Sequence, residues 1–209
     1  MDKQFDKEYI DAELEKIGIR IQRTVKIYLI GGCAMSFRGL KESTKDIDIV
    51  FKNMEEYKTF TEGLFGAQYH EPFVIKSEYA HLEAMKMYEN KDGFHLDLFV
   101  GHVLRKLKLS DSMIVRAEFY KKYGNLSVYL ISKEDIFLFK GLASEARKRD
   151  LADMKVMYPN LEWSVITKEL SSQHLSMELI SWFVSRLEEF RETNKLDVPI
   201  LKELKKLVD

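Results

Sequence analysis

Cysteine, proline and long apolar runs are scarce in this sequence, and each scarcity excludes a class of protein. The single cysteine, Cys33, cannot form an internal disulfide, and there is no cysteine pair to hold structural zinc. No stretch approaches the ~18 uninterrupted apolar residues of a membrane span, and the first residues lack the basic end and apolar run of a secretion signal. We therefore expect a cytoplasmic protein with no membrane partner.

An excess of charge of one sign is also missing. The 209 residues include 33 lysines and arginines against 34 aspartates and glutamates, for a formal charge of −1, so no overall field selects nucleic acid or membrane. Apolar residues make up 45% of the chain, which is enough for a sizeable buried core. The composition is that of an ordinary globular protein.

The spacing of apolar residues predicts a mixed first part and a helical second part. In the first part we expect helices over 6–23, 33–40 and 55–65, strands over 25–30, 46–51, 94–100, 113–120 and 126–131, and a hairpin over 72–90. Ser132 followed by Asp135 is a signal for a helix N-terminus. Further helices are expected over 148–157, 161–171, 175–192 and 197–208. The pattern indicates an α+β protein, with a mixed sheet and helices in residues 1–131 and a helical part in residues 132–209.

Two acids in the second expected strand carry the strongest functional signal. Asp46 and Asp48 alternate with Ile47 and Ile49, so both carboxylates project from one face of the strand while the isoleucines pack behind it. Two like charges roughly 5 to 7 Å apart repel each other unless a cation lies between them. Mg²⁺ is commonly held by one or two carboxylates together with substrate phosphates, which indicates nucleotide chemistry.

Two further features favour the same chemistry. Gly31 and Gly32 lie between a strand and a helix, where backbone amides can approach a phosphate, although a tight turn is the commoner use of such a pair. Asp97 lies between apolar residues in the later strand expected over 94–100. Three acids could hold two Mg²⁺ ions, with Mn²⁺ as a substitute, as two-metal phosphoryl transfer requires.

These residues resemble the signature of the minimal nucleotidyltransferases of the DNA polymerase β superfamily. That signature is an apolar residue and a glycine pair, then Asp-apolar-Asp on the next strand, then a later carboxylate, here Ile30, Gly31, Gly32, Asp46, Asp48 and Asp97. The runs over 31–35 and 44–48, and the segment from Ser132 through Lys140 to Asp153, are most similar to the branch of AbiEii-like abortive-infection toxins. The resemblance covers residues 26 to 157.

The resemblance implies a nucleotidyltransferase-like sheet and assigns roles. Asp46, Asp48 and Asp97 would be the catalytic and metal-binding acids, Asp97 helping to deprotonate the attacking hydroxyl. The residues that would bind the nucleotide are Gly31, Gly32, Thr44, Lys140 and Asp150. Judged from the residues alone, Lys140 is a solvated helix lysine, and Asp150 and Asp153 are helix-capping or structural acids.

Two residues depart from the family pattern. Cys33 follows the glycines where many relatives have serine, and Glu42 stands where arginine is common. Lys41 is the candidate substitute for that arginine.

The expected activity is Mg²⁺-dependent transfer of a nucleoside monophosphate from a nucleoside triphosphate to an acceptor hydroxyl. The toxin resemblance suggests RNA, especially a tRNA end, as the acceptor and an antitoxin protein as a partner; protein hydroxyls and small molecules such as aminoglycosides are the alternatives. A second hypothesis is a catalytically silent relative that binds a nucleotide or a partner protein through the same fold.

Overall fold

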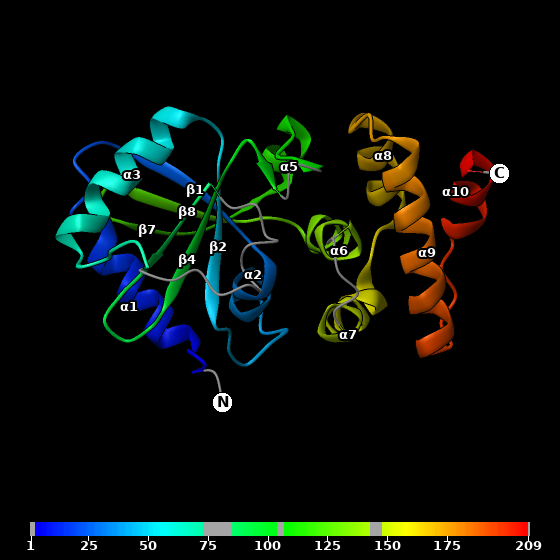
Figure 1. Cartoon of the computed structure of the whole chain (residues 1–209), viewed down its shortest axis with the longest axis horizontal. Coiled ribbons are helices and arrows are strands. Elements are labelled where there is room, and N and C mark those ends of the chain that lie inside the picture. The colour runs from blue at the N-terminus through cyan, green and yellow to red at the C-terminus, as the bar shows by residue number, and fades with distance from the viewer. Residues whose placement is uncertain (1–2, 73–84, 104–106, 143–147, 209) are drawn as a thin grey trace.

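The computed structural model describes residues 3–72, 85–103, 107–142 and 148–208, and Figure 1 shows their arrangement. The strands are β1 (Val25–Ile30), β2 (Asp46–Phe51), β3 (Lys86–Glu89), β4 (His95–Val100), β5 (His102–Val103), β6 (Leu107–Lys108), β7 (Glu118–Tyr123) and β8 (Leu126–Leu130). The helices are α1 (Lys7–Gly18), α2 (Gly31–Phe37), α3 (Met54–Gly66), α5 (Asp111–Arg116), α6 (Lys133–Leu142), α7 (Lys148–Met157), the short 3₁₀ helix η1 (Tyr158–Asn160), α8 (Trp163–Ser172), α9 (Met177–Asn194) and α10 (Leu201–Val208).

A mixed sheet forms the centre of the first part. Six of the described strands join in the order β3-β4-β2-β1-β8-β7, and β5 pairs separately with β6. β1 runs antiparallel to β2 and parallel to β8, while β2 runs parallel to β4. The sheet with its helices and the helical C-terminal part together form an α+β fold, as predicted.

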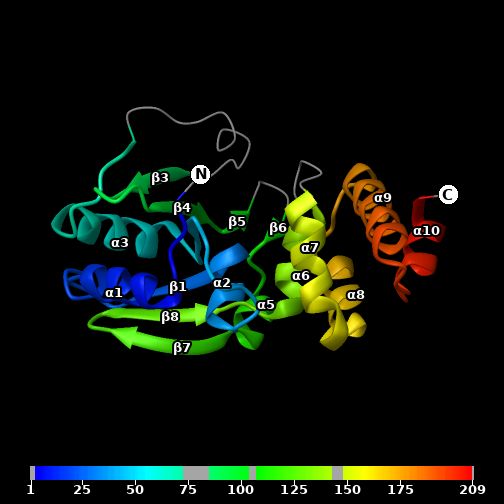
Figure 2. The same cartoon turned by 90° about the horizontal axis from the view of Figure 1, so that it is seen from below.

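One face of the sheet is wholly apolar where β1, β2 and β4 meet. Ile47 and Ile49 of β2 are fully buried, as are Leu96 and Leu98 beside them on β4. Helix α3 packs against these three strands, and α1 lies alongside α3 (Figures 1 and 2). Since alternate residues point to opposite faces, the acids of β2 and β4 are left on the other face.

The helical part is joined to the sheet by a buried ionic cluster at Arg116, the last residue of α5. The Arg116 guanidinium binds the carboxylate of Asp135 on α6, with Nε 2.8 Å from Oδ2, and its Nη2 lies 2.5 Å from Glu169 Oε2 on α8. Ser110 and Ser112 each donate a hydrogen bond of 2.7 Å to Glu169. The cluster therefore links α5, α6 and α8.

Most expected elements are present, with one error. β1, β2 and α7 have the predicted bounds, and Ser132 caps α6, since its hydroxyl accepts a hydrogen bond from Asp135 N–H at 3.2 Å. The first helix is shorter than predicted and ends at Gly18. Of the hairpin expected over 72–90, residues 73–84 lie outside the described residues; in the described remainder, β3 pairs antiparallel with β4.

The strand predicted over 113–120 is wrong. Asp111–Arg116 forms helix α5, and the strand β7 begins only at Glu118. The β-branched Ile114 and Val115 favour a strand locally. The Ser110 side chain instead caps a helix by accepting from Met113 N–H, and the ion pairs of Arg116 hold that helix in place.

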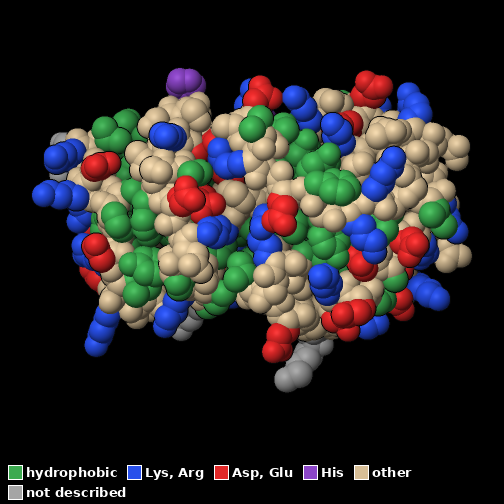
Figure 3. All heavy atoms as spheres, turned by 180° about the vertical axis from the view of Figure 1, so that it is seen from behind, with side chains coloured by type: hydrophobic (Ala, Val, Ile, Leu, Met, Phe, Trp, Pro, Cys, Tyr) green, Lys and Arg blue, Asp and Glu red, His purple; other side chains and the backbone are tan. Residues whose placement is uncertain are grey.

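The surface carries no large field of one sign on the face that Figure 3 shows. Lysine and arginine side chains alternate there with aspartate and glutamate, in keeping with the formal charge of −1. Within the described ranges, no helix has both the length and the apolar character needed to cross a membrane.

Arg116→Met tests the ionic cluster. The substitution leaves the buried carboxylates of Asp135 and Glu169 without their guanidinium partner, so we expect the free energy of unfolding to fall by about 3 kcal/mol or more in urea titrations. Arg191→Met is the matched control, because the side chain of Arg191 is 41% exposed and its ion pair with the neighbouring Glu192, at 3.5 Å, lies at the surface, and it should cost less than about 0.5 kcal/mol. Equal losses in the two variants would contradict the role of the cluster.

Candidate functional site

The three predicted acids lie on one face of the sheet. Asp48 of β2 is the register partner of Asp97 on β4, and residues in register on parallel strands point to the same side. Asp46 follows the same alternation on β2. Asp46 and Asp48 are half-buried, while Asp97 is completely buried. The two acids of β2 thus face a space that solvent reaches, and Asp97 lies one strand further in.

The glycine turn brings backbone against the Asp48 carboxylate. Gly31 follows β1 directly and has φ +60°, in the left-handed region that favours glycine. A Cβ at this position would lie 2.2 Å from Asp48 Oδ2, so only a residue without a side chain permits this approach. Gly32 is similarly close to Thr44, where a Cβ would lie 2.8 Å from Oγ1.

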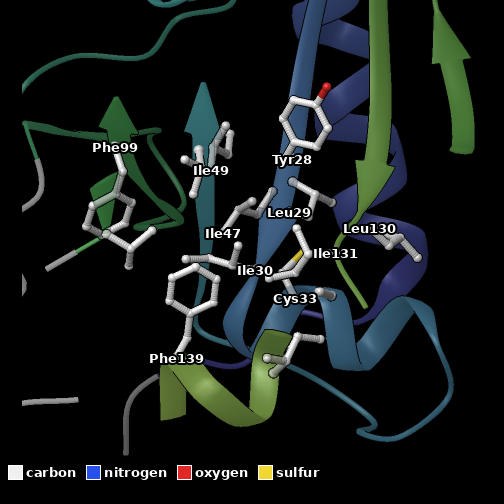
Figure 4. Packing of buried hydrophobic residues seen from close by; sticks show 14 of the residues in the cluster. Tyr28, Leu29, Ile30, Cys33, Ile47, Ile49, Phe99, Leu130, Ile131 and Phe139 are labelled. Atoms are coloured by element: carbon white, nitrogen blue, oxygen red, sulfur yellow. The ribbon is translucent and has the colours of Figure 1, made fainter. Parts of the chain in front are cut away.

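Cys33 points into the core and away from this turn. It is completely buried among apolar residues of the sheet and α6, as Figure 4 shows. Burial raises the pKa of its thiol well above the usual value, and the nearby charges of Asp48 and Asp46 raise it further. The thiol is therefore neutral and packs as a small apolar group.

Thr44 supports Asp46 and anchors the N-terminal segment. Its hydroxyl donates a hydrogen bond to the Asp46 carbonyl oxygen at 3.2 Å and lies 3.5 Å from Asp46 Oδ1. Its backbone N–H donates to Phe5 at 3.0 Å, and its carbonyl oxygen accepts from Phe5 at 2.8 Å. Thr44 is buried, so this contact fixes the start of β2 and with it the position of the first acid.

A cavity of about 360 Å³ opens above these residues. Among the described residues, its lining contains seven of the eight predicted site residues: Gly31, Gly32, Thr44, Asp46, Asp48, Lys140 and Asp150. Asp97 is not among the lining residues, and its side chain is completely buried. Phe99 of β4 and Phe139 of α6 supply an apolar wall, and Figure 4 shows Phe139 reaching from α6 towards the strands.

Lys140 is held in this cavity by two aspartates of α7. Its Nζ lies 2.8 Å from Asp150 Oδ1 and 2.7 Å from Asp153 Oδ2. Burial opposes the charge of Lys140, but the two carboxylates outweigh burial and raise its pKa above the usual value. The interpretation of Lys140 as a solvated helix lysine is thus wrong, since only 13% of its side chain is exposed.

Four charged lining residues were not among the predicted site residues: Lys41, Lys45, Arg149 and Asp153. Lys41 lies between α2 and β2, and its Nζ is 3.3 Å from Asp153 Oδ1. One weak signal in the sequence indicated Lys41: it is next to Glu42, the position where the nucleotidyltransferases that this sequence resembles commonly have arginine. Asp153 had a sequence signal as well, as the second of the two aspartates after Lys140, but nothing local paired it with Lys41.

The donor chemistry suits a hard divalent cation in part. Asp46 and Asp48 offer carboxylate oxygens to the cavity, and two protein carboxylates with substrate phosphates are a usual Mg²⁺ environment. Within the described residues, no group of three or more histidine, cysteine, aspartate or glutamate side chains is arranged to hold a metal ion. The fit is therefore to a site of two carboxylates that a substrate completes, with Asp97 beside it.

Comparisons with known proteins find likeness only among solved structures. No family model and no curated protein matches this chain. One of these solved structures is the lincosamide antibiotic adenylyltransferase LnuA, solved with lincomycin bound. The similarity covers 63% of this chain and 84% of LnuA, at 18% sequence identity and a TM-score of 0.42. Another is JHP933 from Helicobacter pylori, where the similarity covers 95% of this chain and 89% of JHP933, at 14% sequence identity and a TM-score of 0.44. For a candidate nucleotidyltransferase from H. pylori, the similarity covers 98% of this chain and 89% of that protein, at 14% sequence identity and a TM-score of 0.43.

Gly31→Ala tests the approach of the glycine turn to Asp48. The new methyl group would clash with the Asp48 carboxylate, so a crystal structure of the variant should show that carboxylate rotated away from its present position. Gly39→Ala is the matched control, because Gly39 also has a positive φ of +71° but nothing lies within 4 Å of a Cβ there. Both variants should lose about 1 kcal/mol of stability from the left-handed backbone. An unmoved Asp48 in the Gly31 variant would refute the contact.

Proposed function

We propose that the protein is a Mg²⁺-dependent nucleotidyltransferase, which moves a nucleoside monophosphate from a nucleoside triphosphate to an acceptor hydroxyl. The observation that carries the proposal is the shared cavity, where the acids Asp46 and Asp48, the glycine turn and the lysine Lys140 meet. Each part suits one need of the reaction: oxygen ligands for a cation, backbone amides for phosphate oxygens, and an ammonium for the leaving group.

The reaction exchanges one phosphorus–oxygen bond for another. The acceptor oxygen forms a bond to the α-phosphorus, the bond from that phosphorus to the bridging α,β-oxygen breaks, and pyrophosphate leaves with the electron pair. Mg²⁺ held by Asp46, Asp48 and the phosphates would neutralise charge and organise the reacting groups; three acids allow two ions, and Mn²⁺ is the expected substitute.

The residues of this chain have separate roles in the proposal. Gly31 and Gly32 admit the phosphates close to the backbone, and Thr44 fixes the position of Asp46. Lys140 stabilises the charge that develops on pyrophosphate, and Asp150 sets the position of its ammonium through their 2.8 Å ion pair. Asp97, the register partner of Asp48, takes the proton of the attacking hydroxyl, which requires its carboxylate to become accessible from the cavity when substrate is bound.

The acceptor and the biological role follow from the resemblance to the AbiEii-like toxins. RNA, and in particular a tRNA end, is the proposed acceptor, and an antitoxin protein is the proposed partner that restrains the activity in the cytoplasm. In the proposed two-domain organisation, residues 1–131 carry the acids and residues 132–209 supply Lys140 and Asp150.

Labelled triphosphates test the activity. Incubation of the protein with each α-labelled nucleoside triphosphate, Mg²⁺ and total RNA should label an RNA species. The double variant Asp46→Asn with Asp48→Asn should reduce labelling by on the order of a thousandfold, because the carboxylate ligands are lost. Asp111→Asn makes the same kind of change on an exposed side chain and should leave labelling unchanged. Nucleotide binding without transfer to any acceptor would instead support the silent relative.

Asp97→Asn tests the role of the buried acid. The amide keeps the shape of the side chain but cannot accept the proton, so the transfer rate should fall by about a hundredfold or more while the triphosphate still binds. Rates are compared at equal concentrations of folded protein, measured by circular dichroism, because Asp97 is completely buried. A variant with reduced stability but an unchanged rate would show that Asp97 is structural.

A further inference from the structure

The second aspartate of α7 joins two lysines from distant parts of the chain. Asp153 Oδ1 lies 3.3 Å from Lys41 Nζ, and Asp153 Oδ2 lies 2.7 Å from Lys140 Nζ. Asp150 lies one helical turn earlier and forms an ion pair with Lys140 but not with Lys41. One carboxylate therefore lies between two ammonium groups, and all three side chains line the cavity.

The two lysines reach the cavity from different segments of the chain. Lys41 Nζ is 3.7 Å from the position of a Cβ on Gly32, so its ammonium lies directly beside the glycine turn. Lys140 reaches the same cavity from α6, on the opposite side of Asp153. An anion that contacts both ammonium groups must compete with the carboxylate that already does so.

Burial makes this competition effective. The side chain of Asp153 is only 11% exposed, and that of Lys41 is 33% exposed, so the ion pairs are screened less than pairs on an open surface. The lining of the cavity holds four lysine or arginine side chains and four aspartates, so the formal charges cancel. A free anion therefore gains little by entering, whereas a triphosphate that brings a cation to Asp46 and Asp48 gains a second set of contacts.

We propose that Asp153 is a specificity-determining counter-ion, which masks Lys41 and Lys140 so that the cavity takes a metal-complexed triphosphate and rejects free polyanions. The inference rests on the proposed function, because it takes the distal phosphates of a triphosphate as the group that contacts the two lysines. When the substrate enters, its phosphate oxygens replace the Asp153 oxygens at one or both ammonium groups. No covalent bond changes in this exchange.

Binding of inorganic tripolyphosphate without metal tests the proposal. By calorimetry in EDTA and low salt, Asp153→Asn should bind this anion roughly fivefold or more tightly than the unaltered protein, because one negative charge between two ammonium groups is gone. Asp150→Asn should give a smaller gain in affinity, because Asp150 pairs with Lys140 and not with Lys41, so the substitution removes a charge from one of the two lysines only. Asp111→Asn, an exposed acid paired with Lys52, is the matched control and should give none.

Lys41→Met distinguishes a bridge from a single ion pair. Combined with Asp153→Asn, it should remove a large share of the gain in affinity, because one of the two released ammonium groups is absent. A gain of the same size in the double variant would overturn the bridging role, and an affinity in Asp153→Asn that is unchanged or weaker would overturn the masking role altogether. If Asp153→Asn fails to fold, Asp153→Ser makes the same charge change and must raise the affinity for the anion in the same way.

The assay separates this proposal from the proposed function. It uses no metal, no nucleoside and no acceptor, so it measures the effect of Asp153 on anion binding even if the protein has no transfer activity. Absence of nucleotidyl transfer together with the expected anion affinities would leave the masking role intact and overturn only the enzymatic activity. Normal transfer together with equal anion affinities in all variants would do the reverse.

Discussion

The ion pairs of Lys140 with Asp150 and Asp153 are the interaction on which the candidate site depends. Because Lys140 is carried by α6 and the two acids by α7, the pairs fix these helices against each other above the acidic face of the sheet. The pair between Asp153 and Lys41 then ties the helices to the segment that leads into β2. A lysine buried to this extent stays charged only because its partners outweigh the loss of water.

The opposite side of the cavity is built by backbone geometry. Strand alternation places the acids of β2 and β4 on one face, and the left-handed turn at Gly31 lets the chain pass within contact of Asp48. The isoleucines that alternate with the acids of β2 lie on the face covered by α3, so the same alternation that exposes the carboxylates also anchors them. Core packing and site geometry therefore share the same strands.

Local patterns predicted most elements, and their failures have physical causes. β1 and β2 were predictable to the residue because each is a short run rich in β-branched and apolar residues, β1 ending at the glycine pair and β2 beginning at the first acid. Residues 113–116 were predicted as the start of a strand, but Ser110 caps a helix there and Arg116 binds acids on two other helices. The first helix ends early at Gly18, where a Cβ would lie 2.2 Å from the Tyr123 carbonyl oxygen of β7. The ion pairs of Arg116 and the close approach of Gly18 to Tyr123 are contacts with residues far along the chain, which a local pattern does not show.

The sequence by itself determined the two acids on one strand face, the glycine turn beside them and the change to helices after Ser132, because these follow from short-range periodicity and backbone conformation. Only the tertiary structure decided that Asp97 lies in register with Asp48 below the cavity surface, and that Lys41, Lys140 and Asp153 meet. Register between strands and ion pairs between distant segments depend on how the whole core packs, and no local pattern encodes that packing.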